Sequence, residues 1–219
     1  MILGIETSGS ASSVALVADG RLQAERTFEA CMVLNQLLAA QIADLCGGPP
    51  IEAKLDGIAV GIGPGSFTGV RMGVALAKAL AHGLGLPLVG VSSPEAIASS
   101  VGAEDGRTVC VLQTARGDDV YVTALVIEAD GMPREVSLTQ VLPLGEALVA
   151  AEEVLGVAPD FVCGDATDGP GQSPLAVDVA RVGERRMAEA DPDAVFALRP
   201  RYVRLSQAER EHGVDLRLR

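Results

Sequence analysis

Each half of this 219-residue sequence begins with the same succession of predicted strands and turns, and the first half shows it most clearly. An apolar strand at residues 2–5 leads into a polar turn, and a second apolar strand follows at residues 13–18. Asp19-Gly20 is typical of a two-residue hairpin turn, and it leads into a third strand at residues 22–28. Three strands joined by tight turns, with helical patterns after them, restrict this half to a layered α/β unit.

The second half repeats this layout with different residues. Strands are predicted at residues 109–112 and 120–127 with a polar turn between them, and Asp130-Gly131 supplies the hairpin turn. Duplicated units of this kind are the layout of the actin-like, Hsp70 and sugar-kinase (ASKHA) fold, which has two RNase H-like lobes. We therefore expect an α/β protein with an N-terminal actin-like lobe at residues 1–104 and a smaller, reduced C-terminal lobe at residues 105–219 that ends in a basic tail.

Two helices are predicted after the first three strands. Residues 33–46 carry leucine and isoleucine at helical spacing, which predicts an amphipathic helix. Residues 68–84 are apolar on almost every face, and Arg71, Lys78 and His82 form one narrow polar stripe. Another face carries small residues at intervals of four, which lets a neighbouring backbone approach closely. This row packs either on the protein's own sheet or against a partner, and it consists of Gly69, Gly73, Ala77 and Ala81.

The segment at residues 63–73, Gly-Pro-Gly-Ser-Phe-Thr-Gly-Val-Arg-Met-Gly, joins a predicted buried strand at residues 55–62 to the second helix. A glycine turn before a helix places several backbone N–H groups at the positive end of the helix dipole, which suits an anion. The segment differs from the phosphate-binding loop that ends in Lys-Ser/Thr, because Val70-Arg71 stands at that place. The alternative is a tight turn that needs glycine for backbone reasons alone.

As a whole string, the same segment resembles the central motif of the TsaB (YeaZ) family. Residues 2–8 with 13–16, and residues 83–93, agree with that family as well. The resemblance is dense from residue 1 to about residue 100 and thin afterwards, where the similar stretches are 117–121 and 200–204. The sequence departs from the family in two places: Gln113 stands where an Asp is usual, and residues 31–34 stand where a His-Ser pair is common.

The resemblance implies a function without catalysis. The family is the non-catalytic partner of the bacterial transferase that makes threonylcarbamoyladenosine in tRNA. The resemblance therefore implies a scaffold that binds the catalytic paralogue (TsaD-like), with an accessory ATPase (TsaE-like) acting on the pair and tRNA contacted indirectly. It further implies a homodimer when the partner is absent, no cofactor of its own, and ATP or ADP at the interface of the complex.

We expect the helices of the first lobe to pack against the equivalent helices of the partner. The expected interface residues are Leu34, Leu37, Leu38, Ile42, Leu45, Val70, Gly73, Val74 and Ala77. The expected contacts to a nucleotide or anion are Glu6, Ser8, Gly63, Gly65, Ser66 and Thr68.

The residues that would perform chemistry on this fold are largely missing. Phosphotransferases of the fold place an acidic residue at the end of the first strand of each half, and here these positions hold Glu6 and the uncharged Gln113. One carboxylate cannot both hold Mg²⁺ and activate a hydroxyl, since each role needs a negative oxygen, and this weakens the alternative of a small-molecule phosphotransferase. Only two histidines are present, His82 and His212, so we expect no metal site and no catalytic residue. A stand-alone hydrolase is opposed by the missing metal ligands and by Ser66, which has no histidine near it in a recognisable motif.

Composition constrains the class of ligand and the cellular compartment. The formal net charge of −12 argues against a large nucleic-acid footprint, although residues 199–219 are rich in arginine. That tail pairs with the acidic body, stays solvated, or contacts RNA. The four cysteines are well separated, which indicates core thiols in a reducing compartment. The first residues have no basic region before their apolar run, and the longest apolar stretch is interrupted, so we expect a cytoplasmic protein without a membrane span.

Overall fold

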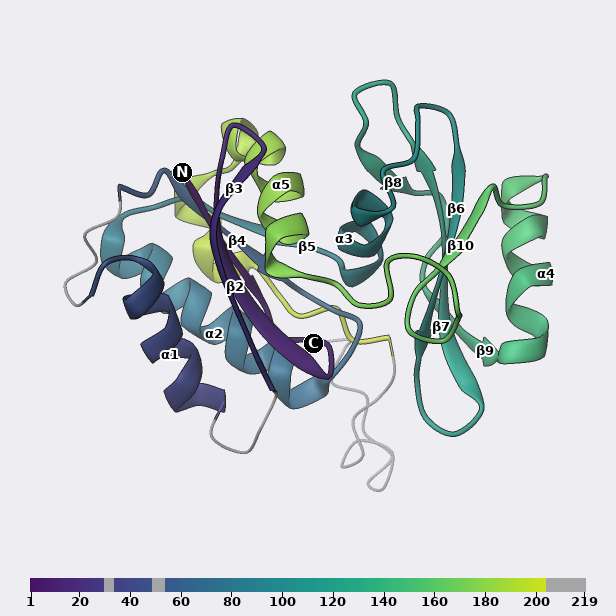
Figure 1. The fold of residues 1–219 in the computed structure, drawn as a ribbon, viewed down its shortest axis with the longest axis horizontal. Coiled ribbons are helices and arrows are strands. Elements are labelled where there is room, and N and C mark those ends of the chain that lie inside the picture. The colour runs from purple at the N-terminus through teal and green to yellow at the C-terminus, as the bar shows by residue number, and fades with distance from the viewer. Residues whose placement is uncertain (30–33, 49–53, 204–219) are drawn as a thin grey trace.

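The computed structural model describes residues 1–29, 34–48 and 54–203, and it contains two mixed β-sheets with helices on their faces (Figure 1). In the first sheet the strand order is β3-β2-β1-β4-β5. The first three strands pair antiparallel, while β4 and β5 continue the sheet in parallel with β1. These strands are β1 (Ile2–Glu6), β2 (Ala11–Ala18), β3 (Arg21–Glu29), β4 (Gly57–Gly61) and β5 (Leu88–Val91).

Helices cover both faces of the first sheet. Helices α1 (Leu34–Leu45) and α2 (Phe67–Leu84) lie side by side against one face. The other face is covered by α5 (Ala176–Arg186), which arrives from the far end of the chain (Figure 1). Two 3-10 turns, Met187–Glu189 and Pro192–Ala197, follow α5.

The second sheet repeats the pattern of the first with fewer strands. Its order is β10-β6-β7-β8, and β9 also pairs with β7. Helix α4 (Leu144–Leu155) covers one face, and α3 (Ser93–Ser100) lies between this sheet and α5. The strands are β6 (Thr108–Thr114), β7 (Asp119–Ile127), β8 (Pro133–Glu135), β9 (Gln140–Pro143) and β10 (Phe161–Cys163). Two such sheets are the two RNase H-like lobes of the actin-like ASKHA fold, with the second lobe reduced, and the predicted fold class is confirmed.

The packing does not follow the chain order throughout. Helix α5 belongs to the second half of the sequence, yet a Cβ at Gly4 of β1 would overlap the backbone of Ala176, so the two elements are in close contact. The division at residue 104 stays a prediction, and residues 176–186 pack on the first sheet whichever unit they are assigned to. The predicted basic tail from residue 204 onward and residues 31–33 at the start of the first predicted helix lie outside the described residues.

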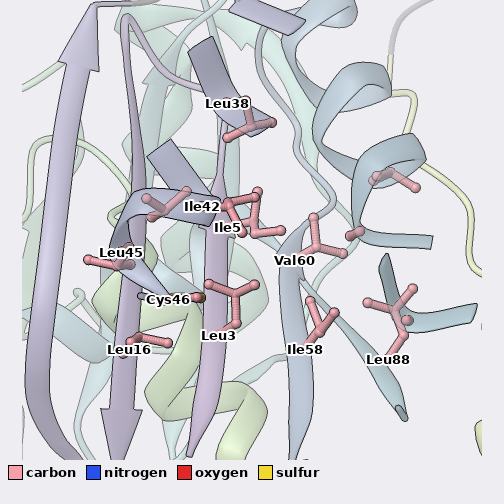
Figure 2. Close-up of a cluster of buried hydrophobic side chains, with 14 of the residues drawn as sticks. Leu3, Ile5, Leu16, Leu38, Ile42, Leu45, Cys46, Ile58, Val60 and Leu88 are labelled. Atoms are coloured by element: carbon pink, nitrogen blue, oxygen red, sulfur yellow. The ribbon is translucent and has the colours of Figure 1, made fainter. Parts of the chain in front are cut away.

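The core of the first lobe contains most of the residues that the sequence assigned to a partner interface. Leu38 and Ile42 of α1 meet Leu3 and Ile5 of β1 in one buried cluster (Figure 2). Six predicted interface residues are buried inside the chain in this way, so their side chains offer no area to a partner, and that part of the prediction is wrong. They are Leu38, Ile42, Leu45, Val70, Val74 and Ala77. Leu37 is half-buried, and the side chain of Leu34 lies outside the described residues.

The row of small residues on α2 faces the protein's own sheet. A Cβ at Gly73 would overlap Thr7 Oγ1, and a Cβ at Gly69 would overlap the Thr7 carbonyl oxygen. Thr7 Oγ1 also donates a hydrogen bond to the Gly69 carbonyl oxygen at 2.8 Å. Of the two alternatives for this row, the structure shows the close approach of α2 to the chain that follows β1, and Gly73 is not an interface residue.

The sequence reading missed α3, β8 and β9. Helix α3 begins with a capping box, in which Ser92 and Glu95 bond to each other's backbone N–H groups. No helix among the described residues is long and apolar enough to span a membrane.

Candidate functional site

The loop between β4 and α2 is held against the turn that follows β1. The Ser66 N–H donates to the Ser8 carbonyl oxygen at 2.7 Å, and a Cβ at Gly65 would overlap that same carbonyl. Gly63 has a φ of +86°, a conformation that favours glycine. Ser66 then caps α2, since its hydroxyl accepts a hydrogen bond from the Gly69 N–H at 3.2 Å. The positive end of α2 therefore lies close to the end of β1.

Glu6 ends β1, but its carboxylate is sealed inside the protein. Its Oε1 accepts a hydrogen bond from the Ser8 N–H, whereas Oε2 has no hydrogen-bond partner among the described residues. A Cβ at Gly61 would overlap the carboxylate. Burial raises the pKa of Glu6, and the hydrogen bonds from Ser8 and Thr7 only partly oppose that rise. Glu6 therefore does not present a carboxylate to a ligand, and the prediction that it contacts a nucleotide is wrong.

A polar cleft of about 600 Å³ lies between the two lobes. The first lobe contributes the turn after β1 and the start of α2, and the second lobe contributes the end of β6, part of β7 and the 165–174 loop. The lining residues are Ser8, Gly9, Ser10, Gly65, Ser66, Gln113, Thr114, Ala115, Tyr121, Asp165, Ser173 and Pro174.

Gln113 is the counterpart of Glu6 in the second lobe, as the repeated layout predicts. It ends the buried part of β6, only 7% of its surface is exposed, and its Oε1 has no hydrogen-bond partner in the described part of the chain. Beside it, the Thr114 N–H donates to Asp165 Oδ1 at 2.7 Å. Hydroxyl groups, one side-chain amide and one carboxylate therefore make up the functional groups of the cleft.

This lining does not fit a magnesium–nucleotide complex. The cleft residues named above include one carboxylate, Asp165, and no lysine or arginine to offset phosphate charge. Within the described residues, no three His, Cys, Asp or Glu side chains are grouped to hold a metal ion. Burial raises the pKa of the Cys110 and Cys163 thiols to about 12, so neither is a nucleophile at neutral pH.

The six predicted nucleotide or anion contacts are only partly brought together. Ser8, Gly65 and Ser66 line the cleft, Gly63 is buried behind it, and Thr68 is exposed on the first turn of α2. The sequence reading did not assign Asp165, Ser173 or Tyr121 to the site. The Gly/Asp/Pro-rich composition of residues 164–174 is typical of a loop, and only the fold places that loop against the end of β6.

The outer sides of α1 and α2 form a second surface with unusual composition. We define the outer face as the exposed alanines Ala39 and Ala40 of α1 with Ala75 and Ala79 of α2. Neither residues 34–43 nor residues 72–77 contain a charged side chain, although the whole chain has a formal net charge of −12. Charged residues lie only at the borders of these two stretches, at Asp44, Arg71 and Lys78. An exposed helix surface with few charges is typical of a surface that another protein covers.

The fold is that of an actin-like ASKHA protein, with two lobes and a cleft between them. Of the two positions that are acidic in phosphotransferases of this fold, one holds the buried Glu6 and the other holds the uncharged Gln113. Comparisons with known proteins give the family. A family model described as "TsaD: tRNA N6-adenosine threonylcarbamoyltransferase" matches residues 41–159. The chain belongs to the TsaB (YeaZ) family, as its relatives show.

The Bacillus subtilis "tRNA threonylcarbamoyladenosine biosynthesis protein TsaB" is 31% identical over 95% of this chain and 96% of its own length. The Escherichia coli protein of the same name is 38% identical, over 55% of this chain and about half, 52%, of its own length. The solved structure "YeaZ from Pseudomonas aeruginosa" superimposes with a TM-score of 0.69 at 25% identity, over 92% of this chain and 98% of that one.

Proposed function

We propose that this protein takes part in threonylcarbamoyladenosine biosynthesis on tRNA in the cytoplasm as a non-catalytic subunit that binds the TsaD-like transferase. The non-catalytic role is supported above all by the residues at the ends of β1 and β6, Glu6 and Gln113. Glu6 is sealed under Gly61, and Gln113 cannot be a metal ligand of the carboxylate type or a general base. The same pair weighs against the alternative, a small-molecule phosphotransferase.

The outer face is the surface that we assign to the partner. The burial of Leu38, Ile42 and Val74 moves the expected contact from the apolar faces of α1 and α2 to their exposed alanines. Small uncharged side chains let the helices of another protein pack closely, and an obligate interface typically buries more than about 2,000 Å². Because the catalytic relative has a related domain, we expect the same face to form a homodimer when the partner is absent.

A nucleotide belongs to the proposal only at the junction of two subunits. The cleft of this chain does not supply cations, so ATP or ADP is expected to bind the complex and scarcely the free chain. Gly65 and Thr68 would contribute backbone N–H groups from the positive end of α2, while the Ser66 N–H is already bonded to the Ser8 carbonyl oxygen. A TsaE-like ATPase acting on the pair completes the proposed assembly.

Reconstituted threonylcarbamoyl transfer tests the function. The TsaD-like transferase and the TsaE-like ATPase are assayed on tRNA with and without this chain, and we expect transfer only when the chain is present. Transfer that proceeds equally well without it would contradict the proposal. ATP turnover by the isolated chain with a small-molecule acceptor would instead support the phosphotransferase.

Matched helix-surface variants test the interface. Ala79→Glu on α2 is expected to abolish heterodimer formation and transfer, because it places a charge in a close-packed face. Val149→Glu is the control, since Val149 is 58% exposed on α4 in the other lobe. Size-exclusion chromatography with light scattering measures both the heterodimer and the homodimer. Equal behaviour of the two variants would contradict the assignment of the outer face.

A further inference from the structure

Helix α2 and the segment that follows α5 carry a group of cationic and aromatic side chains that the proposed interface does not use. We define the cation–aromatic surface as Phe67, Arg71, Lys78 and His82 of α2 with Phe196 and Arg199. Helix α2 contains no Asp or Glu at all, although acidic residues outnumber basic ones in the chain by 29 to 17. A local excess of positive charge on an acidic protein indicates an anionic ligand.

The cations of this surface are not neutralised within the described protein. Lys78 Nζ donates to the Phe196 carbonyl oxygen at 3.2 Å, and Arg199 Nη1 donates to the same oxygen. The pKa of Lys78 is lowered, first by partial burial and then by the charge of Arg199. None of the ion pairs between described residues includes Arg71, Lys78 or Arg199, whereas the neighbouring Arg201 pairs with Glu135. Two positive charges that lie close to one carbonyl oxygen repel each other, and a bound anion would reduce that repulsion.

Aromatic rings are interleaved with these cations. The Arg71 guanidinium carbon lies 5.1 Å from the centroid of the Phe67 ring, and that ring also contacts Tyr202 at 5.1 Å. At the other end of α2, His82 meets Phe196 edge-on at 5.0 Å. The chain has only four Phe and two Tyr, and three of these six rings lie along α2. Phe196 is 59% exposed, so its ring can receive another planar group, whereas Phe67 is 39% exposed and already has Arg71 over its ring.

We propose that the cation–aromatic surface binds a single-stranded stretch of RNA, with Arg71, Lys78 and Arg199 on phosphates and with a base stacked on Phe196. An acidic protein segment would satisfy the charges, but it would give no reason for exposed rings beside them, whereas base stacking on aromatic side chains accounts for both. The proposal deepens the proposed function, and it rests on that function for the identification of the RNA as tRNA.

The surface adjoins the outer face. Arg71, Ala75 and Ala79 follow one row of four-residue spacing along α2, and Lys78 and His82 follow the neighbouring row. Helix α2 therefore turns its glycines toward the sheet and its alanines outward, while Lys78 and His82 contact Phe196 of the C-terminal segment. An RNA bound on the cation–aromatic surface would run along the edge of the heterodimer.

Fluorescence anisotropy with the full chain and a labelled RNA stem–loop with an unpaired loop tests the proposal, with an RNA duplex as the second probe. The charge variant is Arg71→Gln with Lys78→Gln. The matched control is Arg21→Gln with Lys54→Gln, which removes one exposed arginine and one exposed lysine elsewhere, neither of them ion-paired within the described residues. Circular dichroism and Tm verify that each variant is folded.

The charge variant is expected to bind the stem–loop about tenfold more weakly at low salt, and its slope of log K against log salt is expected to fall by about 1.4, or about 0.7 for each lost phosphate contact. The control is expected to bind as the wild type does. Phe196→Ala is expected to weaken stem–loop binding about fivefold and to leave duplex binding unchanged, because only unpaired bases can stack on the ring.

Several results would overturn the proposal: no binding by the wild type at low salt, equal losses in the charge variant and the control, or a silent Phe196→Ala. Loss of the heterodimer in the charge variant with unchanged RNA affinity would assign this surface to a protein partner instead. If the chain supports transfer but RNA binding ignores these residues, the RNA surface fails and the proposed function stands. If the chain binds RNA here but has no effect on transfer, the function fails and the surface stands.

Discussion

The two lobes of this protein share a layout but differ in how tightly their helices close over the sheet. In the first lobe, Gly69 and Gly73 let α2 approach Thr7 until no side chain fits between them, and on the opposite face Gly4 does the same for α5. In the second lobe, α4 buries only Ala147 and Ala151 and leaves Leu144, Leu148 and Val149 exposed. In the first lobe, the tightly packed helices bury Glu6 at the end of β1. In the second lobe, where the packing is looser, Gln113 of β6 still lines the cleft.

The largest effect is expected from opening the contact between α2 and Thr7. Gly73→Leu forces a side chain into a space that a single Cβ already overfills, so we expect a loss of about 3 kcal/mol or more in the free energy of unfolding. Gly83→Ala is the control, because nothing lies within 4 Å of its Cβ position on the same helix, and it is expected to stabilise by about 0.5–1 kcal/mol. Urea unfolding measures both. A folded Gly73→Leu protein with unchanged stability would contradict the sealed first lobe.

The next effect concerns the other sealed face and depends on pH. Asp178 of α5 is 3% exposed, and burial raises its pKa from 3.8 to about 6 despite the nearby Arg181. The folded state holds this proton more tightly than the unfolded state, so stability from this group is present below about pH 4 and is lost as the pH rises to about 6, by about 3 kcal/mol at most.

Asp178→Asn removes that loss. The variant is expected to gain stability over the wild type as the pH is raised from about 4 to about 7, and the two proteins are expected to converge at the acidic end. Paired unfolding curves across this range measure the difference. A constant difference between the two proteins would show that Asp178 does not carry the pH dependence.

A smaller effect is expected where the helices begin. Ser66 caps α2 through its hydroxyl, whereas the N-cap position of α4, Pro143, makes no side-chain hydrogen bond. Ser66→Ala is therefore expected to cost about 1 kcal/mol, measured as the free energy of unfolding. Ser66→Asp keeps a capping oxygen and is expected to restore most of that loss. If Ser66→Ala and Ser66→Asp have the same free energy of unfolding, the capping hydrogen bond of Ser66 does not stabilise α2, and this difference between the lobes disappears.

The smallest effect is expected on the outside of the second lobe. Val149→Gln replaces an exposed apolar side chain of α4 and is expected to change the free energy of unfolding by no more than about 0.5 kcal/mol. A loss comparable to that of Ser66→Ala would mean that α4 is covered in solution, and the comparison of the lobes would then need revision.

The repeated pattern of strands and turns predicted the fold because it depends on residues close together in the chain. Period-two strands and the Asp-Gly turns located β1, β2, β3, β6 and β7, and helical periodicity located α1 and α2. Helix α3 was missed because it has only eight residues, although Ser92 and Glu95 carry the capping-box spacing that signals its start. Strands β8 and β9, of three and four residues, are too short to show a period.

The site was predicted less well, because burial depends on contacts between distant segments. Leucine and isoleucine on α1 fit a partner or a core equally well in the sequence, and only the packing on Leu3 and Ile5 decides between them. The position of Gln113 at the cleft followed from the repeated layout, but Asp165 reaches it from a loop more than fifty residues away. Side-chain patterns in sequence report which face is apolar, and the fold determines what covers it.

The return of α5 to the first sheet also sets an order for synthesis. Strand β1 leaves the ribosome well before α5, yet α5 covers one of its faces and is complete only at Arg186. Helices α1 and α2 can close the opposite face much earlier, so the nascent first lobe exposes an apolar sheet surface while the whole second lobe is being translated. Such exposed surface is prone to aggregation during folding. Truncation before residue 176 should therefore yield an insoluble first lobe, whereas the same residues fold normally once α5 is attached.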